Sequence, residues 1–192
     1  EGILNCGKHY PGYSNANVDP HHDLPTVQRT LNELLALEWI PFVGTLPLLD
    51  LVMVGHVSYP KIDASGLPAT LARKMVHETL RQDWKFKGCT VTDDMDMGAI
   101  KAKYGSAESA VMALKAGNDL MLVCHAVDAV PEIAKALKAV PQEIKEESFA
   151  RIETLRARLA KPTPFCMDEF KTLDEGVKEL REKTLKTTAA SR

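Results

Sequence analysis

The 192-residue sequence predicts an α/β fold in which short parallel strands alternate with amphipathic helices. Four short runs of apolar or small residues have the composition of strands that are buried on both faces. Segments with apolar residues at helical spacing lie between these runs. Connections of this kind join parallel strands by right-handed crossovers, so the two observations together indicate a parallel sheet.

Each predicted strand is followed by a predicted helix, which gives the order β-α-β-α-β-α-β-α. The strand runs are residues 3–6, 49–54, 89–92 and 120–124. The apolar positions of the helical segments are Val27, Leu31, Leu34 and Leu35; Leu71, Met75, Val76, Thr79 and Leu80; Ala107, Ala110, Val111 and Leu114; and Val130, Ile133, Ala134 and Leu137. Gly117 ends the third helix as a C-terminal glycine, and Pro141 stops the fourth.

The last part of the sequence predicts helices without further strands. One apolar stripe is formed by Ile144, Phe149, Ile152, Leu155 and Leu159. Two prolines within residues 161–167 indicate a linker, and Leu173, Val177 and Leu180 predict a final exposed helix. We therefore divide the chain into a domain at 1–160 and a linker with a helical tail at 161–192.

Composition and charge indicate a soluble globular protein. The 24 basic and 26 acidic residues give a formal net charge of −2, and 45% of the residues are hydrophobic. This balance gives no basic surface for nucleic acid. No run of 18 apolar residues occurs, so no membrane-spanning segment is expected.

The cysteines point to a reducing compartment. Cys6, Cys89, Cys124 and Cys166 have no C-x-x-C spacing, so zinc ribbons and thioredoxin-like redox sites lack support. Four cysteines in a chain of this length do not suggest a disulfide framework. We expect a cytoplasmic location on this ground.

Titratable side chains follow the predicted strands at the edge where parallel α/β sheets bind ligands. Lys8 and His9 follow the first strand, His56 the second and Asp93 the third. Lys8 could donate to sugar hydroxyls or to a phosphate, and Asp93 is a candidate nucleophile, metal ligand or structural cap. Because side chains alternate along a strand, Asp94 points elsewhere. One of the two aspartates is therefore expected to be structural and to bond loop amides.

The loop after the first strand holds a candidate acid/base pair. Asp19 lies two residues from His21, and a carboxylate at that spacing can orient an imidazole and raise its basicity. A solvated loop histidine is the alternative. A zinc site built from His9, His21, His22 and Asp23 is another, although the spacing matches no standard zinc motif.

Three separated motifs resemble the bacterial β-N-acetylglucosaminidases of glycoside hydrolase family 3. KHYPG at 8–12, followed by DPH at 19–21, resembles that family's KHFPGHG…DSH stretch. GCTVTDDMDM at 88–97 resembles its segment of a glycine, three apolar residues, S or T, and DDLSM. HVSY at 56–59 and SGLPAT at 65–70 fit between them. The motifs stand in the family's order, and the match covers about residues 2–160.

The resemblance implies the last four strands of a (β/α)8 TIM barrel and a retaining β-N-acetylhexosaminidase activity. The residues that it implies are Asp93 as the nucleophile, His21 with Asp19 as the acid/base dyad, and Lys8, His9 and His56 in the pocket for N-acetylglucosamine. It implies cleavage of cell-wall muropeptide fragments in peptidoglycan recycling, with no metal and no cofactor. The expected partner is therefore a carbohydrate substrate.

Several positions depart from the family pattern without removing a catalytic group. Tyr13 and Ser14 stand where the family has histidine and glycine, Pro20 replaces the serine of DSH, and Thr79 stands in place of an aliphatic residue. Proline restricts the loop around it, so loop closure is expected to differ.

Four predicted strands are half of the eight that a TIM barrel of about 250 residues needs. We therefore expect the chain, which enters an apolar run directly after Glu1, to be the second half of a barrel that acts in a longer protein. Two alternatives stay open. One is another family 3 β-glycosidase such as a β-glucosidase, against which the Asp19 and His21 pair argues. The other is a non-catalytic half-barrel that self-associates through its exposed sheet edges.

Overall fold

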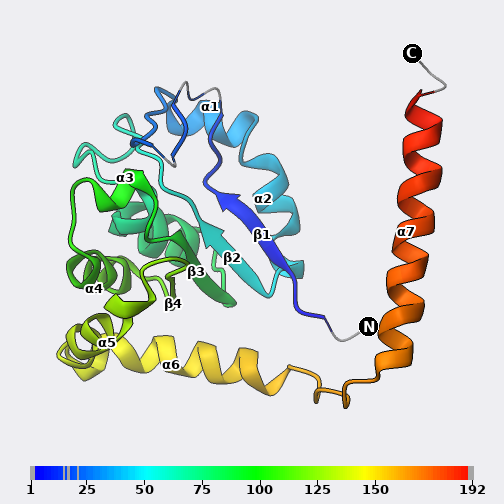
Figure 1. Cartoon of the computed structure of the whole chain (residues 1–192). Coiled ribbons are helices and arrows are strands. Elements are labelled where there is room, and N and C mark those ends of the chain that lie inside the picture. Colours follow the sequence, from blue (N-terminus) through cyan, green and yellow to red (C-terminus); the bar gives the residue numbers. More distant parts are fainter. Residues whose placement is uncertain (1–2, 15, 17, 21, 190–192) are drawn as a thin grey trace. The chain divides into compact units, whose positions relative to one another are not determined.

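The computed structural model describes residues 3–14, 16, 18–20 and 22–189 (Figure 1). The chain forms two compact units, one ending at Leu159 and the other beginning at Ala160.

The first unit is built on one sheet of four parallel strands in the order β1-β2-β3-β4. The strands are β1 (Cys6–Tyr10), β2 (Leu51–Val54), β3 (Cys89–Asp94) and β4 (Leu120–Leu122). The two central strands pair in an unbroken register, whereas both outer pairings shift register near their carboxyl ends. The predicted α/β class with a parallel sheet is confirmed.

Helices follow each strand, as the alternating pattern predicts (Figure 1). The α-helices are α1 (Leu31–Ala36), α2 (Ile40–Thr45), α3 (Gly98–Lys101), α4 (Ser106–Ala116), α5 (Val130–Lys138) and α6 (Gln142–Ala157). The 3-10 helices are η1 (Leu46–Leu48), η2 (Ala69–Leu71) and η4 (Val127–Ala129), and η3 (Lys74–Asp83) is a π-helix. Thr30 and Glu33 form a capping box that starts α1, and Gly117 ends α4 at a φ of +114°.

The main core packs against one face of the sheet. Val52 and Val54 have no exposed surface and point into this core, whereas Leu51 and Met53 point to the opposite face and are half-buried. The helix residues of the same core include Leu34, Trp39, Met75, Val76 and Leu80. The apolar spacing of the second predicted helix therefore does mark its buried side.

Two strands differ from their predicted limits, and both differences concern the candidate site. The first strand is Cys6–Tyr10 rather than residues 3–6, and Ile3 is 85% exposed. The third strand continues to Asp94. An edge strand needs no continuous apolar run, because it has only one neighbour, and a strand end can carry carboxylates where the sheet opens to solvent.

The second unit contains the long helix α7 (Met167–Ala189), preceded by a non-helical segment with two prolines at 162 and 164. In the ranges that the structure describes, no helix is long and apolar enough to cross a membrane.

Candidate active site

Asp93 lies at the carboxyl end of β3 and is partly exposed. Its side chain is 16% exposed. Its Oδ1 accepts a hydrogen bond from the backbone N–H of Asp94 at 2.9 Å, which leaves Oδ2 toward the space in front of the sheet. A carboxylate held on a strand end and open to solvent on one side can act as a nucleophile, because its position is fixed while one oxygen remains available.

Lys8 and His9 lie on β1 itself, not after it, and they flank the same end of the sheet. The peptide bond between them is cis. His9 Nε2 lies 3.9 Å from Asp93 Oδ2, so a side chain of β1 and a side chain of β3 come together across the end of β2. Lys8 is exposed. The structure thus brings His9 and Asp93 together and leaves the Lys8 ammonium group in solvent at the same edge.

His56 is fully buried behind this edge instead of lining it. Nε2 lies 2.9 Å from the Asp94 carbonyl oxygen and Nδ1 lies 2.8 Å from Thr70 Oγ1. Burial lowers the pKa of His56, although the bond to the Asp94 carbonyl and the nearby carboxylates oppose the shift. Nε2 donates to the Asp94 carbonyl oxygen, and Thr70 Oγ1, which contacts Nδ1, also donates to the Gly55 carbonyl at 2.8 Å. His56 therefore fixes the backbone just after Asp93.

The loop after β1 is anchored by buried aromatic side chains. Trp39 Nε1 donates to the Pro11 carbonyl at 3.0 Å, and Tyr59 Oη donates to the Gly12 carbonyl at 2.6 Å. Gly12 has a φ of +102°, a conformation that glycine adopts without strain. These contacts fix the backbone from which the Tyr13 side chain projects toward His9.

The candidate acid/base dyad lies further along this loop. Asp19 is described, and its carbonyl accepts the backbone N–H groups of His22 and Asp23 in a turn. The Asp19 carboxylate is near enough to Tyr13 to raise the pKa of the phenol. His21 lies outside the described residues, so its assignment stays a prediction.

Asp94 and Asp96 hold the two strand-end loops together. Asp94 Oδ1 accepts the N–H groups of Asp96 and Cys124, and Asp96 Oδ2 accepts those of His125 and Ala126. Burial raises the pKa of Asp96, but the two amide bonds together with the charges of Lys101 and His125 outweigh it, and the net pKa is lowered. The expectation that one aspartate of the 93–94 pair bonds loop amides is confirmed for Asp94.

One group among the described residues has its possible metal-ligand atoms within 4.8 Å of one another, namely Asp94, Asp96 and His125. His125 Nδ1 lies 3.0 Å from Asp94 Oδ2. Backbone amides of both loops bind the two carboxylates, and Lys101 Nζ lies 4.0 Å from Asp96 Oδ1, so the group is explained by loop closure and a nearby cation. The residues weighed for zinc include His21, so that alternative falls partly outside the described residues.

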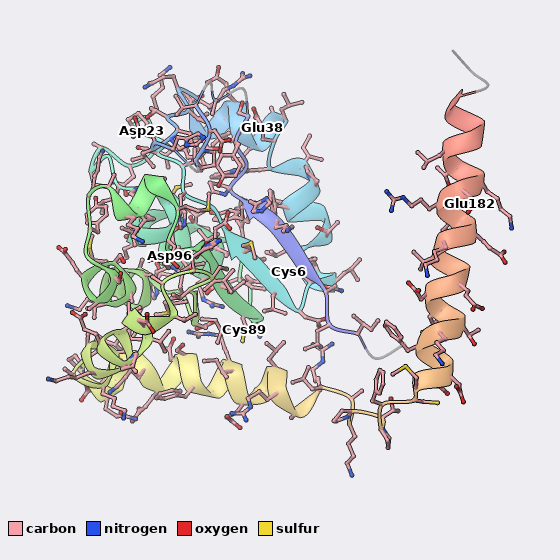
Figure 2. All side chains as sticks on the ribbon, in the orientation of Figure 1. Cys6, Asp23, Glu38, Cys89, Asp96 and Glu182 are labelled. Carbon is pink, nitrogen blue, oxygen red and sulfur yellow. The ribbon has the colours of Figure 1, made fainter. Side chains whose placement is uncertain are left out.

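Figure 2 labels residues at both ends of the sheet. Asp23 and Asp96 lie at the end where the strands finish, and Cys6 and Cys89 lie where the strands begin.

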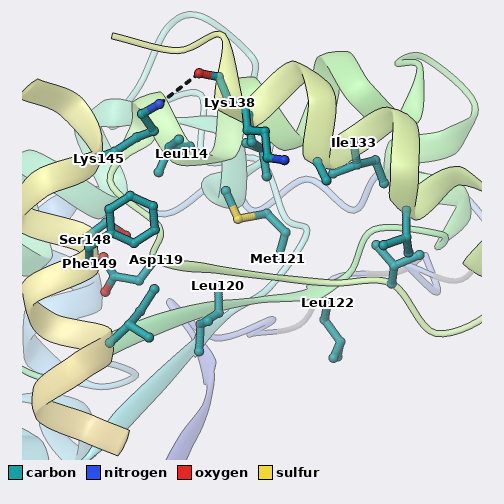
Figure 3. Close-up of a pocket in the computed structure, with 15 residues that line it drawn as sticks. Leu114, Asp119, Leu120, Met121, Leu122, Ile133, Lys138, Lys145, Ser148 and Phe149 are labelled. Carbon is teal, nitrogen blue, oxygen red and sulfur yellow. Dashed lines mark hydrogen bonds between the residues drawn. The ribbon is translucent and has the colours of Figure 1, made fainter. Parts of the chain in front are cut away.

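An apolar pocket of about 590 Å³ lies elsewhere, between β4, α5 and α6 (Figure 3). Leu120, Ile133 and Phe149 are among its walls. The titratable groups around Asp93 do not line this pocket.

The family model described as the glycosyl hydrolase family 3 N-terminal domain matches residues 1–155. The chain belongs to glycoside hydrolase family 3. Curated relatives named β-hexosaminidase include one from Bordetella parapertussis, 34% identical over 163 residues, and one from Idiomarina loihiensis, 36% identical over 124 residues. These alignments cover 84% and 65% of this chain.

Solved structures of the same family have the same fold. A family 3 β-N-acetylglucosaminidase from Paenibacillus is 32% identical with a TM-score of 0.81 over 86% of this chain and 34% of that one. NagZ from Neisseria gonorrhoeae, in complex with N-trifluoroacetyl-D-glucosamine, is 32% identical with a TM-score of 0.67 over 80% of this chain and 42% of that one. The parallel sheet and its helices thus correspond to part of the TIM-barrel-like domain of the family.

This family 3 chain spans less than half the length of the curated relatives it matches: 44% for the Bordetella protein and 37% for the Idiomarina protein. The candidate site described above is built from β1, β2, β3 and the loop after β1. Sequence reasoning did not select Tyr13 as a site residue. The sequence marks it only as the position where tyrosine replaces the histidine of the family motif.

Proposed function

We propose that this family 3 chain carries the reacting groups of a retaining β-N-acetylhexosaminidase, active in a complete family 3 protein. The observation that supports it most strongly is Asp93 on the end of β3, with one carboxylate oxygen facing His9 at 3.9 Å. The relatives named β-hexosaminidase support N-acetylglucosaminides as the substrate class.

In this proposal Asp93 acts as the nucleophile. One carboxylate oxygen attacks the anomeric carbon, and the bond from that carbon to the leaving-group oxygen breaks, so that a covalent glycosyl-enzyme forms. The leaving oxygen takes a proton from the imidazolium of His21. Neutral His21 then removes a proton from water, whose oxygen attacks the same carbon and releases Asp93.

The remaining predicted residues support this chemistry. Asp19 orients the His21 ring and stabilises its protonated form. Lys8 and His9 donate hydrogen bonds to the sugar from β1. His56 acts from behind the site, because its bond to the Asp94 carbonyl fixes the end of β3.

A direct assay tests the activity. The 192-residue chain and a full-length family 3 version are given 4-nitrophenyl N-acetyl-β-D-glucosaminide and 4-nitrophenyl β-D-glucoside. We expect hydrolysis of the first by the longer protein. A preference for the glucoside would contradict the proposal and favour a β-glucosidase. Hydrolysis of neither substrate by either protein would also contradict it.

The nucleophile is tested by Asp93→Asn in the active protein. We expect turnover to fall by about a thousandfold or more, because the amide cannot form the glycosyl-enzyme. Asp128→Asn, at an exposed position in η4, is the matched control and should keep the parent rate. An Asp93→Asn variant with near-parent rates would show that another group is the nucleophile.

We further propose muropeptide fragments as the natural substrate and the cytoplasm as the location. Release of N-acetylglucosamine from a purified disaccharide-peptide, compared with release from chitobiose, tests the first. The second follows from the cysteine usage alone and is tested by cell fractionation.

We also propose that the isolated chain associates with a second copy of itself through the open edges of its sheet. β1 and β4 each have one strand neighbour among the described residues. Apolar side chains lie exposed near both edges, including Leu48 close to β1 and β2 and Phe149 in the pocket beside β4 (Figure 3). Two copies related by a two-fold axis would complete eight strands, the number in a closed TIM barrel.

A further inference from the structure

The phenol ring of Tyr13 is fixed from three directions in the candidate site. Its Oη accepts a hydrogen bond from the backbone N–H of His56 at 3.2 Å. Its ring meets the ring of His9 edge-on, with 6.0 Å between the centroids. Gly55 leaves room for the hydroxyl, because a Cβ at that position would lie 2.7 Å from Oη. The hydroxyl therefore has a defined position next to the ends of β1 and β2.

The hydroxyl keeps a proton that it can donate. The N–H of His56 occupies an acceptor site of Oη, and in the part of the chain that the structure describes no hydrogen bond uses the phenolic proton. Burial, with the charges of Asp93 and Asp19, raises the pKa of Tyr13 to about 12. The phenol thus remains a neutral donor throughout the neutral pH range.

The space that this donor faces is the one in front of Asp93. His9 contacts both residues, since its Nε2 lies 3.9 Å from Asp93 Oδ2 and its ring packs against Tyr13. A sugar carbon within reach of Asp93 would therefore bring its neighbouring oxygens close to Tyr13.

We propose that Tyr13 is a substrate-binding residue whose O–H donates a hydrogen bond to an uncharged oxygen of the sugar held against Asp93. The proposal rests on the proposed function, because it requires a sugar held against Asp93. A phenol differs here from the histidine of the family motif in keeping one charge state. Imidazole changes charge near pH 6.5, whereas the phenol does not.

The first test measures the placement of Tyr13 without any sugar. The chain is prepared with ¹³C-labelled tyrosine, and the pKa of Tyr13 is followed by NMR in the parent and in Asp93→Asn. We expect the pKa to fall toward the ordinary value near 10 when the Asp93 charge is removed. Asp128→Asn is the control. An unchanged pKa in Asp93→Asn would overturn the placement.

The titratable groups near Tyr13 are His9 from β1, His56 from the end of β2, Asp93 from β3, Asp19 from its own loop and Tyr59. The titration is therefore read above pH 9, beyond the ordinary ranges of imidazole and carboxyl groups. Tyr59 is present in the parent and in Asp93→Asn, so the difference between the two proteins reports the coupling of Tyr13 to Asp93.

The second test measures the hydrogen bond to the sugar. The affinity of the protein for N-acetyl-D-glucosamine is measured by titration calorimetry in the parent, in Tyr13→Phe and in the control Tyr104→Phe, whose ring lies in a different apolar cluster. Loss of one neutral hydrogen bond should weaken binding about three- to tenfold in Tyr13→Phe. Binding within twofold of the parent would overturn the sugar contact.

A second variant separates binding from a purely structural role. Tyr13→His restores the family residue and keeps a hydrogen-bond donor at the position, but imidazole gains a charge as the pH falls, so we expect its affinity to change between pH 8 and pH 5.5 in a way that the parent's affinity does not. If the pH dependence of the two proteins is the same, position 13 does not touch the sugar. A parent that binds no N-acetylglucosamine would contradict the proposed function, while the NMR titration would still decide whether Tyr13 faces Asp93.

Discussion

Asp93 and Asp94 are neighbours in sequence with different surroundings. Asp93 presents a carboxylate oxygen toward His9, whereas both oxygens of Asp94 bind the loops that follow β3 and β4. Side-chain alternation along β3 separates them, because successive residues point to opposite faces. The same alternation should separate the effects of substitution, with chemistry lost at Asp93 and loop geometry lost at Asp94.

His56 should make stability depend on pH. Its folded-state pKa is lowered below the ordinary value near 6.5, so the unfolded chain binds the proton more readily than the folded chain. The stabilising contribution is therefore fully present above pH 6.5 and is lost as the pH falls below it. We expect the urea midpoint to fall between pH 7.5 and pH 5.5, a window above the titration of ordinary carboxyl groups.

His56→Gln tests this assignment. It should cost about 1–3 kcal/mol at pH 7.5, since Gln replaces only part of the buried hydrogen bonding, and it should flatten the pH dependence. His77 is the matched comparison, because its pKa is also lowered by partial burial but its ring lies near the surface. A slope that disappears in His77→Gln and persists in His56→Gln would contradict the assignment.

At the scale of elements, Asp119 joins four segments at the end of the sheet opposite the candidate site. It precedes β4, and its carboxylate accepts from Arg81 of η3, from the backbone N–H of Thr90 in β3 and from Arg151 of α6. Its side chain has no exposed surface. Removing this carboxylate leaves the buried Arg81 guanidinium with its bonds to the Gly88 carbonyl and the Thr90 hydroxyl but without the negative charge that compensates its own.

Asp119→Ala should therefore lower the free energy of unfolding by about 3–5 kcal/mol, measured by urea denaturation. Asp174→Ala is the control, because Asp174 pairs with Lys178 on the surface of α7 and surface pairs add little. Equal, small effects of the two substitutions would show that the Asp119 cluster is solvated rather than buried.

The element pattern could be predicted from the sequence, but strand limits at the site could not. The buried positions Met75, Val76, Thr79 and Leu80 follow from periodicity, and Gly117 marks the end of α4. The limits of β1 were wrong because edge strands tolerate polar residues such as Lys8 and His9, so apolar composition says little about them.

The sequence predicted which residues lie at the site better than it predicted what each of them contacts. Asp93 and His9 are brought together, as the strand-end argument expects. The burial of His56 could not be read from the sequence, because it depends on Thr70 and the Asp94 carbonyl, which are brought to it by the fold. Tyr13 was visible only as a departure from a motif, and its contact with the His56 amide required the structure.

At the scale of the whole molecule, an open four-stranded sheet leaves strand edges and apolar surface to be covered. The exposed fractions are 73% for Leu48, 57% for Ile40 and 53% for Phe149. Leu48 lies near β1, because its carbonyl accepts from the Asn5 side chain just before that strand, and Phe149 lies in the pocket beside β4. A two-fold arrangement would place β1 of each copy beside β4 of the other. The exposed apolar surface near both edges would then be buried in each copy.

We therefore expect the isolated chain to sediment at twice its 21.2 kDa mass at micromolar concentration. Phe149→Lys, which places a charge in the pocket wall, should shift it to the monomer, because burying an unpaired ammonium group opposes association. Leu173→Lys on α7 is the matched control, at a side chain that is 69% exposed and far from the sheet edges in sequence. A monomer at all concentrations would contradict pairing through the sheet edges. A dimer that Leu173→Lys disrupts and Phe149→Lys does not would also contradict it, because only Phe149→Lys alters the surface beside β4.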